Sequence, residues 1–593
     1  MRLSASWLLV AGMVGGVGIT ILSGRDQSPP SSQPHTSNTV TLSIVGTTDL
    51  HGAIFSTDGR GGLPLLAGFI NNVRAARAAD GGAVLLLDAG DAFLDGMESN
   101  LSEGALVVDA YNAMGYTAAA IGNHEFDFGP VDAPGARQMS GDVRGALKSR
   151  ATQAHYPFLA SNLIDVATDR PVAWPNVRPS VVVDAAGVQV GIIGVMTIDA
   201  LSLTAPVNVQ GLRIAPLAPT ISAEASRLRA AGAEVIVVTA HAGGSCSRFN
   251  RPTDLSSCDP SSEIFALARS LPKGLVDLIT AGHTHDAVAH QVEGVAIVQA
   301  YPRGTAFARA DVVFDRDTRR VVRTDVFAPQ HVCARQDPET FSCDATAAST
   351  SSVPVSHYEG RIVVPDARVS AAMAPALARV RELQATPVGV FIETPIRRIG
   401  DPESPLAHLL ADTLRDALSA DVAIHRGGLR ADIPAGNLTF GHLYAAFPFD
   451  NRVSRVTLSG DELRRVFAEE IRQRRQRGSL AIAGVLVKTG CTGERLHVEL
   501  FRPNGRRLDP EERLVVVGMD SLVGSLIFTT IAPPPDVGVS HTAPILREVV
   551  EDWLRRRAGR LASEQFVDPD HPRWKLPDTV LTGCVGLEVG KNR

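Results

Sequence analysis

Eight polar side chains suited to metal binding or proton transfer stand at the ends of five apolar segments. The segments TLSIVG, AVLLLDAG, AAAIG, EVIVVTA and VDLITAG each run directly into a carboxylate, an amide or an imidazole. The carboxyl ends of strands in an open α/β sheet meet at one edge, where ligands bind. We therefore predict that these groups converge, although they are far apart in the sequence. In chain order they are Asp49, His51, Asp91, Asn123, His124, His241, His283 and His285.

The donor atoms of this set are oxygen and nitrogen, and no thiolate is among them. Such donors suit two divalent ions such as Mn, Zn, Fe or Co rather than a calcium cage or a soft-metal site. Two ions about 3.5–4 Å apart that share one carboxylate can clamp a phosphate ester, acidify water and stabilise both oxygens of an in-line displacement. The pattern predicts metal-dependent hydrolysis of phosphate esters and leaves the identity of the metals open.

Each of these residues also has an ordinary structural interpretation when it is taken alone. An Asp-x-His at a strand end is often a turn, and Asn123 could cap the segment that follows it. His241 and His283 could be buried histidines of the core. The joint occurrence at five strand ends is what favours a metal centre.

The elements that must position these groups alternate along the first half of the chain. Helical periodicity is predicted over residues 65–79, 105–114 and 221–230, between the apolar strands. This alternation indicates a layered α/β domain in which helices cover the faces of the sheets.

The second half of the chain has a different pattern. A Ser/Thr/Ala-rich stretch at 345–355 is typical of a linker, and residues 367–384 form an amphipathic helical pattern. From about Val388 short strands mix with helices expected at 406–418 and 460–475. A second, α+β domain is predicted there.

The N-terminus has the pattern of an export signal. One Arg precedes an apolar run from Trp7 to Leu22, and a polar Pro/Ser-rich stretch follows it. Because a cleavage site of small residues is not clear, an uncleaved membrane anchor stays open as an alternative. In both cases we expect the protein to be exported, whether periplasmic, at the cell surface or secreted.

The six cysteines fit an exported protein with disulfides, and none of them has the CxxC spacing of a zinc site. Buried free thiols are the alternative, because the sequence does not fix connectivity. By proximity we expect Cys246 to pair with Cys258, Cys333 with Cys343, and Cys491 with Cys584.

The formal net charge of −6 argues against a nucleic-acid polymer as the partner. Domains that bind such polymers usually carry a basic excess. A small anionic substrate, a phosphate ester or a nucleotide, needs only local cations. Oligomeric state is left open.

The blocks TTDLHG, GDAF, GNHEFD, TAHAGG and GHTH, in this order, resemble the motifs of the calcineurin-like metallophosphatases, specifically of the 5′-nucleotidase family. The resemblance implies a dimetal centre in which Asp91 bridges the ions. It also implies that His124 acts on the phosphate while Asp127 orients its ring. One metal is expected on Asp49, His51, Asp91 and His285, and the other on Asp91, Asn123, His241 and His283.

The C-terminal half resembles the same family. The run RGGLR, which ends at Arg430, looks like the NGGGIR element whose arginine binds the substrate side, and Phe449 matches a phenylalanine that stacks on a nucleobase. An aromatic face holds any base for about 1–3 kcal/mol. Both have alternatives, Arg430 as a surface ion pair and Phe449 as a core residue. The resemblance also implies rotation of this domain about the helix at 367–384.

The chain departs from the family pattern at several of these positions. His425 and Arg426 stand where the family has Asn, and Asp520 is followed by Ser where a second stacking aromatic is expected, with Phe528 as a nearby substitute. A phosphate-side arginine matches Arg398 or its neighbour Arg397, next to an insertion at 401–402. The substrate range is therefore open.

We expect the protein to be an enzyme that hydrolyses nucleotides by in-line attack of a metal-bound water or hydroxide, with activity as a 5′-nucleotidase, 2′,3′-cyclic phosphodiesterase or UDP-sugar hydrolase. The alternatives are a thiosulfohydrolase of sulfur oxidation that acts on a carrier protein, and a non-catalytic surface binding protein. The fold expected from the resemblance is a four-layer α/β/β/α metallophosphatase domain followed by a smaller α+β 5′-nucleotidase C-terminal domain. The expected ranges are 1–26 for the signal or anchor, 27–39 for a linker, 40–345 for the first domain, 346–387 for a linker and helix, and 388–593 for the second domain.

Overall fold

The computed structural model describes residues 38–131, 141–337, 342–344, 353–399, 403–449, 451–474, 480–523, 526–531 and 543–584. The apolar run from Trp7 to Leu22 lies outside them, so both alternatives for the N-terminus stay predictions. Among the described helices, none has the length and hydropathy needed to cross a membrane.

Two sheets form the centre of the first domain. Within the described residues, the first sheet has the strand order β18-β17-β1-β4-β5-β6-β9. Its middle strands β1, β4, β5 and β6 run parallel, as βαβ connections require, while β17 pairs antiparallel with β1. The bounds are β1 Thr39–Thr47, β4 Ala83–Asp88, β5 Ala118–Ala120, β6 Phe158–Leu159, β9 Val177–Arg178, β17 Ala306–Asp315 and β18 Arg320–His331.

The second sheet has the order β10-β11-β13-β14-β16-β15 in the described part of the chain. Its strands β11, β13, β14 and β16 are parallel, and they are mostly apolar because both of their faces are covered. The bounds are β10 Ser180–Ala185, β11 Val188–Met196, β13 Val235–His241, β14 Leu278–Ala281, β15 Val288–Val292 and β16 Val295–Gln299.

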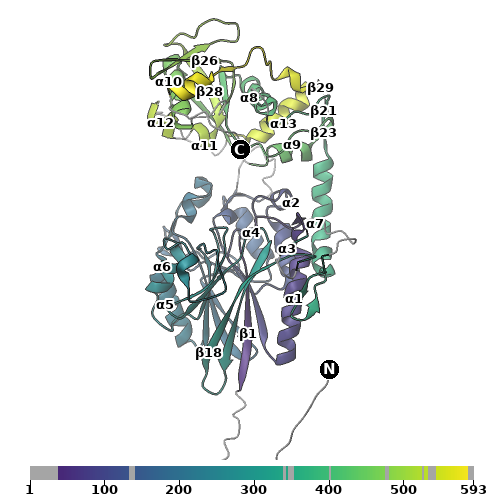
Figure 1. The fold of residues 1–593 in the computed structure, drawn as a ribbon, viewed down its shortest axis with the longest axis vertical. Helices are drawn as coiled ribbons and strands as arrows, with labels where there is room; N and C mark the ends of the chain where they lie inside the picture. The colour runs from purple at the N-terminus through teal and green to yellow at the C-terminus, as the bar shows by residue number, and fades with distance from the viewer. Residues whose placement is uncertain are drawn as a thin grey trace, which may run out of the picture. The chain divides into compact units, whose positions relative to one another are not determined.

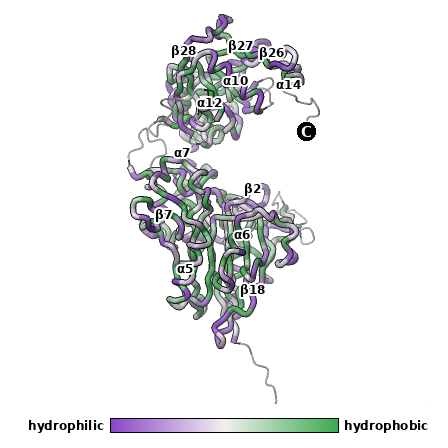
Figure 2. The backbone as a smooth tube through the Cα atoms, turned by 90° about the vertical axis from the view of Figure 1, so that its left-hand side faces the viewer, coloured by the Kyte–Doolittle hydropathy of each residue, from purple (hydrophilic) through white to green (hydrophobic). Residues whose placement is uncertain are grey.

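The two sheets pack face to face, and helices cover their outer faces. Leu42 and Ile44 of the first sheet share one buried cluster with Val190 and Ile192 of the second. Figure 1 shows α5 (Leu217–Ala230) and α6 (Glu263–Ser270) on one side of the strands, and α1 (Leu63–Asp80) and α3 (Ala105–Met114) on the other. In Figure 2 much of this interior is green, that is, hydrophobic. The expected α/β/β/α order of layers is confirmed.

Helix α7 (Ala367–Ala385) matches the helix predicted at 367–384. Val369, Met373 and Leu377 on its first half are buried in the same cluster as residues of α1 and α3. This part of the helix is therefore held by the first domain, and Pro375 lies within it.

The C-terminal domain is α+β, as expected. Its described strands form three small sheets, with orders β23-β21-β29, β24-β28-β22-β25 and β27-β26-β30, around one apolar cluster. The strand bounds are β21 Pro387–Ile392, β22 Val422–His425, β23 Gly436–Thr439, β24 Val453–Ser459, β25 Ala481–Ala483, β26 Leu486–Thr492, β27 Arg495–Phe501, β28 Arg513–Met519, β29 Gly559–Leu561 and β30 Trp574–Lys575. The helices predicted at 406–418 and 460–475 are α8 (Pro405–Ala417) and α10 (Gly460–Arg474). The other described helices of this domain are α9 (Phe440–Ala446), α11 (Asp520–Val523), α12 (Leu526–Ile531), α13 (Leu546–Arg557) and α14 (Asp578–Gly583).

All six cysteines form the three disulfides expected from proximity: Cys246–Cys258, Cys333–Cys343 and Cys491–Cys584. The alternative of free thiols is excluded in this structure. Disulfides of this kind persist in oxidising compartments.

Candidate metal centre

The polar residues predicted from the strand ends come from neighbouring strands. β1, β4 and β5 are adjacent in the first sheet, and β13 and β14 are adjacent in the second. Their carboxyl ends therefore deliver the side chains to one place. Asp49 and His51 follow β1, Asp91 follows β4, Asn123 and His124 follow β5, His241 ends β13, and His283 and His285 follow β14.

The loops that carry these residues adopt backbone conformations that non-glycine residues rarely take. Such conformations persist where surrounding bonds enforce them, and they cluster at functional sites. Here the N–H of Asp49 donates to the carbonyl of Gly90 at 2.9 Å, and the N–H of His51 donates to that of Asp91 at 3.0 Å. Five of the predicted metal ligands have positive φ: Asp49 (50°), His51 (50°), Asp91 (59°), His283 (77°) and His285 (57°).

The side chains gather into two adjoining groups of donor atoms. Asp49, His51 and His285 form one, Asp91, His241 and His283 form the other, and the donor atoms of each group lie within 4.8 Å of one another. The Nε2 atoms of His51 and His285 are 2.8 Å apart. Carboxylate oxygens and imidazole nitrogens in such clusters fit divalent metal ions.

Asn123 joins the second group. Its Oδ1 lies 3.0 Å from Nε2 of His241, and that nitrogen is 3.2 Å from Oδ2 of Asp91 and 3.1 Å from Nδ1 of His283. The structure thus brings all seven predicted metal residues together.

The protonation states of the histidines fit this role. Burial lowers the pKa of His51 and of His283 to about 4, so both imidazoles are neutral at pH 7 and can donate a lone pair. His241 differs: burial opposes its charged form, but the adjacent Asp91 carboxylate raises the pKa of its ring to about 10. A metal ion would replace that proton, which makes metal binding a proton-releasing step.

One hydrogen bond fixes which nitrogen of His241 faces the cluster. Nδ1 of His241 lies 2.9 Å from the carbonyl oxygen of Ala89, which can only accept. Nδ1 therefore carries the proton and donates it, and Nε2 is directed at Asp91 and Asn123. Metal-binding histidines are commonly held in this way by a carbonyl or carboxylate.

His124 and Asp127 form the pair expected from the sequence. Nδ1 of His124 is 2.5 Å from Oδ2 of Asp127, and both lie on or next to the short helix η1 (His124–Phe126). Burial would lower the pKa of His124, but the bond to Asp127 and the charge of Asp91 raise it to about 9. The ring is therefore charged at pH 7, and its Nε2–H is the proton left to donate.

Three groups around this site were missed by the sequence reasoning. Glu125 is buried, and its carboxylate accepts three backbone N–H bonds: from Asp91 at 2.9 Å, Ala92 at 2.7 Å and Gly122 at 2.7 Å. It thereby ties the loop after β4 to the loop after β5. The sequence gives no distinct signal for Glu125 beyond its place in the GNHEFD block.

The other two missed groups are Thr204 and Asp88. The Thr204 hydroxyl donates to Oδ1 of Asp127 at 2.7 Å, which leaves Oδ2 of that carboxylate for His124. Asp88 is buried at the end of β4 and accepts hydrogen bonds from Thr47, Gly90 and Tyr111. Burial raises the pKa of Asp88 to about 7.

A disulfide-closed loop supports the segment that carries His283 and His285. The N–H of Cys246 donates to the carbonyl of Ala287 at 3.0 Å, and the Ser245 hydroxyl donates to the carboxylate of Asp286. The Thr284 hydroxyl also donates to the carbonyl of Gly244 at 2.7 Å. The metal loop and the disulfide loop are therefore bonded side by side.

In the C-terminal domain the structure brings two of the predicted substrate residues together. The guanidinium of Arg430 lies 5.0 Å from the centre of the Phe449 ring, within cation–π range. Arg430 is exposed and Phe449 is half-buried, so neither is a core residue. No ion pair of Arg430 occurs within the described residues, and Arg426 instead pairs with Glu470 at 2.9 Å.

The remaining predicted substrate residues, Arg398 and Asp520, form hydrogen bonds of their own. Arg398 is exposed, and its backbone N–H donates to Asp432 at 2.9 Å. Oδ1 of Asp520 accepts from the N–H of Ser521 at 2.8 Å, and Asn451 lies 3.5 Å from it. The suggestion that Phe528 replaces the missing aromatic is wrong, because Phe528 is 4% exposed and packs in the domain core.

Comparison with known proteins gives two family matches. Residues 42–287 match the calcineurin-like phosphoesterase model, and residues 384–526 match the model of the 5′-nucleotidase C-terminal domain. The chain is a calcineurin-like phosphoesterase with a 5′-nucleotidase C-terminal domain. It is therefore a hydrolase of the phosphoester class, in which divalent metal ions serve as cofactors.

Individual relatives agree with this assignment. Protein UshA of Yersinia enterocolitica is 24% identical over 557 residues, which cover 89% of this chain and 93% of UshA. A 5′-nucleotidase of Vibrio cholerae is 25% identical over 466 residues, or 73% of this chain and 76% of the relative. The crystal structure of a 5′-nucleotidase precursor from Thermus thermophilus shares the fold, with a TM-score of 0.53 at 22% identity over 88% of this chain and 97% of that one.

Proposed function

We propose that this phosphoesterase hydrolyses nucleotides, acting as a 5′-nucleotidase with two divalent metal ions. The observation that carries the proposal is the pair of adjoining donor groups at the strand ends, each with one carboxylate and two imidazoles. The family of the C-terminal domain and the 5′-nucleotidase among the relatives support a nucleotide as the substrate.

In this proposal Asp49, His51 and His285 hold one ion, and Asn123, His241 and His283 hold the other. Asp91 would be the shared ligand, as the family resemblance implies; its Oδ2 lies 3.2 Å from Nε2 of His241. When bound, the ions act as Lewis acids that neutralise phosphate charge and acidify water.

His124 and Asp127 supply the chain's own contribution to the reaction. Asp127 keeps the ring charged through Nδ1, so the proton on Nε2 is available to a phosphate oxygen on which negative charge builds up. A donor held in place before the reaction stabilises such charge without reorganisation. Thr204 supports this arrangement by holding the other carboxylate oxygen of Asp127.

Arg430 and Phe449 are proposed to bind the nucleotide. The half-buried ring of Phe449 suits stacking on a base, and the adjacent guanidinium suits an anionic or π-rich group. Asp520 and Arg398 stay candidates for further polar contacts. Because Ser521 follows Asp520 where a second stacking aromatic is expected, we propose a broad range of bases rather than a strict preference, and activity on 2′,3′-cyclic nucleotides or UDP-sugars is included in it.

The protein is proposed to act outside the cytoplasm. Three disulfides and the apolar N-terminal run support export, whether the segment is a cleaved signal or an anchor.

The test is phosphate release from 5′-AMP by the full-length protein, first after chelation and then after addition of Mn²⁺. Release that depends on the metal and is lost in Asp91→Ala supports the proposal. An Asp317→Ala variant, changed in an exposed turn after β17, is the matched control and should keep full activity. No release from the metal-loaded protein would overturn it in favour of a thiosulfohydrolase or a binding role.

A further inference from the structure

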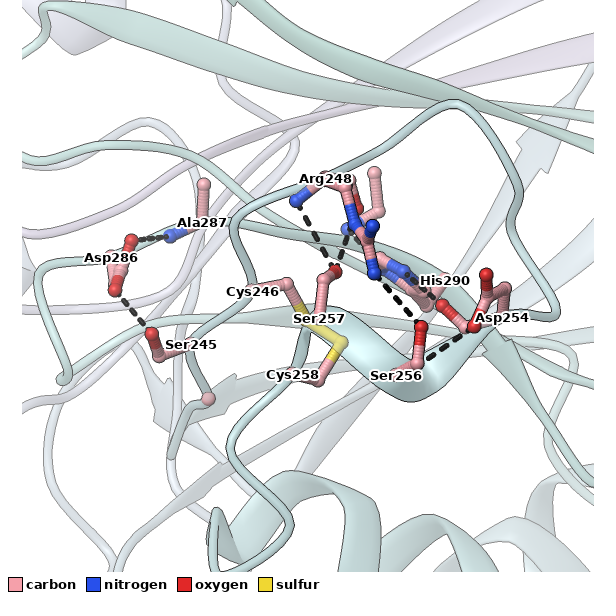
Figure 3. Close-up of a disulfide and its surroundings, with 12 residues drawn as sticks. Ser245, Cys246, Arg248, Asp254, Ser256, Ser257, Cys258, Asp286, Ala287 and His290 are labelled. Atoms are coloured by element: carbon pink, nitrogen blue, oxygen red, sulfur yellow. Dashed lines mark hydrogen bonds between the residues drawn. A yellow bond between two sulfur atoms is a disulfide. The ribbon is translucent and has the colours of Figure 1, made fainter.

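A polar cavity lies in the disulfide-closed loop between β13 and α6. It has a volume of about 280 Å³ and is lined by Arg248, Asn250, Arg251, Asp254 and Ser257. None of these residues belongs to the predicted metal centre. Figure 3 shows Arg248, Asp254 and Ser257 around the Cys246–Cys258 disulfide.

The loop around the cavity is held in shape by several bonds. The disulfide joins its two ends, and the N–H of Ser247 donates to the carbonyl of Ser257 at 3.1 Å. Beneath it Nε2 of the buried His290 lies 3.1 Å from the carbonyl oxygen of Asp254, as Figure 3 shows. A cavity fixed before binding loses little conformational entropy when a ligand enters.

The charges that line the cavity favour an anion. Two guanidinium groups and one carboxylate line the cavity, and no ion pair of Arg248 or Arg251 occurs in the part of the chain that the structure describes. The Arg248 guanidinium donates to the Ser256 hydroxyl at 2.9 Å. The Asp254 carboxylate is engaged by the N–H of Ser256 at 3.0 Å. The Asn250 amide adds a neutral donor, whereas the Ser257 hydroxyl accepts the N–H of Arg248 at 3.2 Å and donates to the carbonyl of Arg248 at 3.3 Å.

The shape of these donors selects the kind of anion. A guanidinium presents a planar fork of N–H groups that matches the oxygens of a phosphate. No aromatic ring lines the cavity: the neighbouring Phe249 is partly buried, with its ring edge-on to His290 at 6.3 Å. A nucleobase would therefore find no stacking partner, whereas a compact tetrahedral oxyanion needs none.

We propose that this cavity is a binding site for inorganic phosphate, separate from the metal centre. The phosphate is held by Arg248 and Arg251, with Asn250 as a further donor. The site does not depend on the proposed nucleotidase activity, because none of its residues is assigned to that chemistry.

The test measures binding of inorganic phosphate to full-length chelated protein carrying Asp91→Ala, by calorimetry at low ionic strength. Arg248→Gln and Arg251→Gln should each weaken the binding at least about tenfold, as expected for the loss of charge-assisted hydrogen bonds. The matched control is Arg269→Gln, on the exposed side of α6, which should leave the affinity within twofold.

Competition separates this site from other modes of binding. Sulfate should displace phosphate at a similar concentration, and 5′-AMP should bind no more tightly than phosphate itself. Either an absence of saturable phosphate binding, or equal affinity in the parent and in both cavity variants, would overturn the proposal. Because both arginines are exposed, the variants should fold, and retention of the Cys246–Cys258 disulfide by mass spectrometry checks this.

Discussion

Replacement of Glu125 by Gln should disturb the candidate metal centre without touching any of its donor atoms. The Glu125 carboxylate joins two loops through three backbone N–H groups, with Oε2 serving Asp91 and Gly122 and Oε1 serving Ala92. An amide keeps one acceptor oxygen and turns the other position into a donor. If the amide oxygen takes the Oε2 position, the amide NH₂ faces the N–H of Ala92. Two donors then face each other where the wild-type protein has a hydrogen bond of 2.7 Å between Ala92 N and Oε1.

The expected loss of metal affinity can be estimated from the hydrogen bond between Ala92 and Glu125. A buried N–H without a partner costs about 1–3 kcal/mol. Since these bonds set the distance between Asp91 and Asn123, we expect the metal affinity to fall by about 10–100-fold, the usual range for a group that supports a metal ligand.

The assay is a titration of chelated protein with Mn²⁺, followed by the electron paramagnetic resonance signal of the free ion. The matched control is Glu511→Gln, an exposed glutamate of the C-terminal domain, which should bind Mn²⁺ like the wild type. Melting temperature and circular dichroism establish that the Glu125→Gln variant is folded. Mn²⁺ affinity within twofold of the wild type in a folded protein would refute the argument that Glu125 positions Asp91.

Three further predictions follow from other parts of the structure. Gly122→Ala should lower Mn²⁺ affinity, because the added Cβ would lie 2.2 Å from Oδ1 of Asp91. Gly490→Ala is the control, because Gly490 has open space around it. Unchanged Mn²⁺ binding in both variants would contradict the predicted effect of the clash. Burial, with the charge of Arg573, lowers the pKa of His408 to about 4 from 6.5, so the unfolded chain takes up this proton first as the pH falls. The contribution of His408 to the free energy of unfolding is therefore fully present above pH 6.5. It falls by up to about 3 kcal/mol as the pH decreases to 4. In His408→Gln this part of the decrease should vanish from denaturant unfolding curves, and equal pH dependence in both proteins would be the contrary result. Cys491→Ser/Cys584→Ser opens a loop of 93 residues and should cost about 5 kcal/mol, whereas Cys246→Ser/Cys258→Ser opens one of 12 and should cost about 3 kcal/mol; a reversed order in urea unfolding would count against the loop-entropy account.

The sequence by itself determined which residues form the candidate metal centre. A strand that ends in a polar residue can be recognised from the local sequence, since it needs only an apolar run followed by Asp, Asn or His. The rule that ligands bind at the carboxyl ends of parallel strands then predicts that these residues lie together. Asp49, Asp91 and His241 could be grouped in this way. Helix positions were predicted to within a few residues for the same reason, because amphipathic periodicity is local.

Tertiary structure decided what depends on contacts between distant segments. Glu125 and Thr204 have no distinctive spacing in the sequence, and their roles come from backbone N–H groups and a carboxylate that only folding brings near. Phe528 is similar: an aromatic next to a polar turn can stack on a ligand or fill a core, and the packing of the C-terminal domain buries it. The physical reason is that periodicity records which face of an element is apolar, whereas hydrogen-bond partners and cavities depend on how the elements meet.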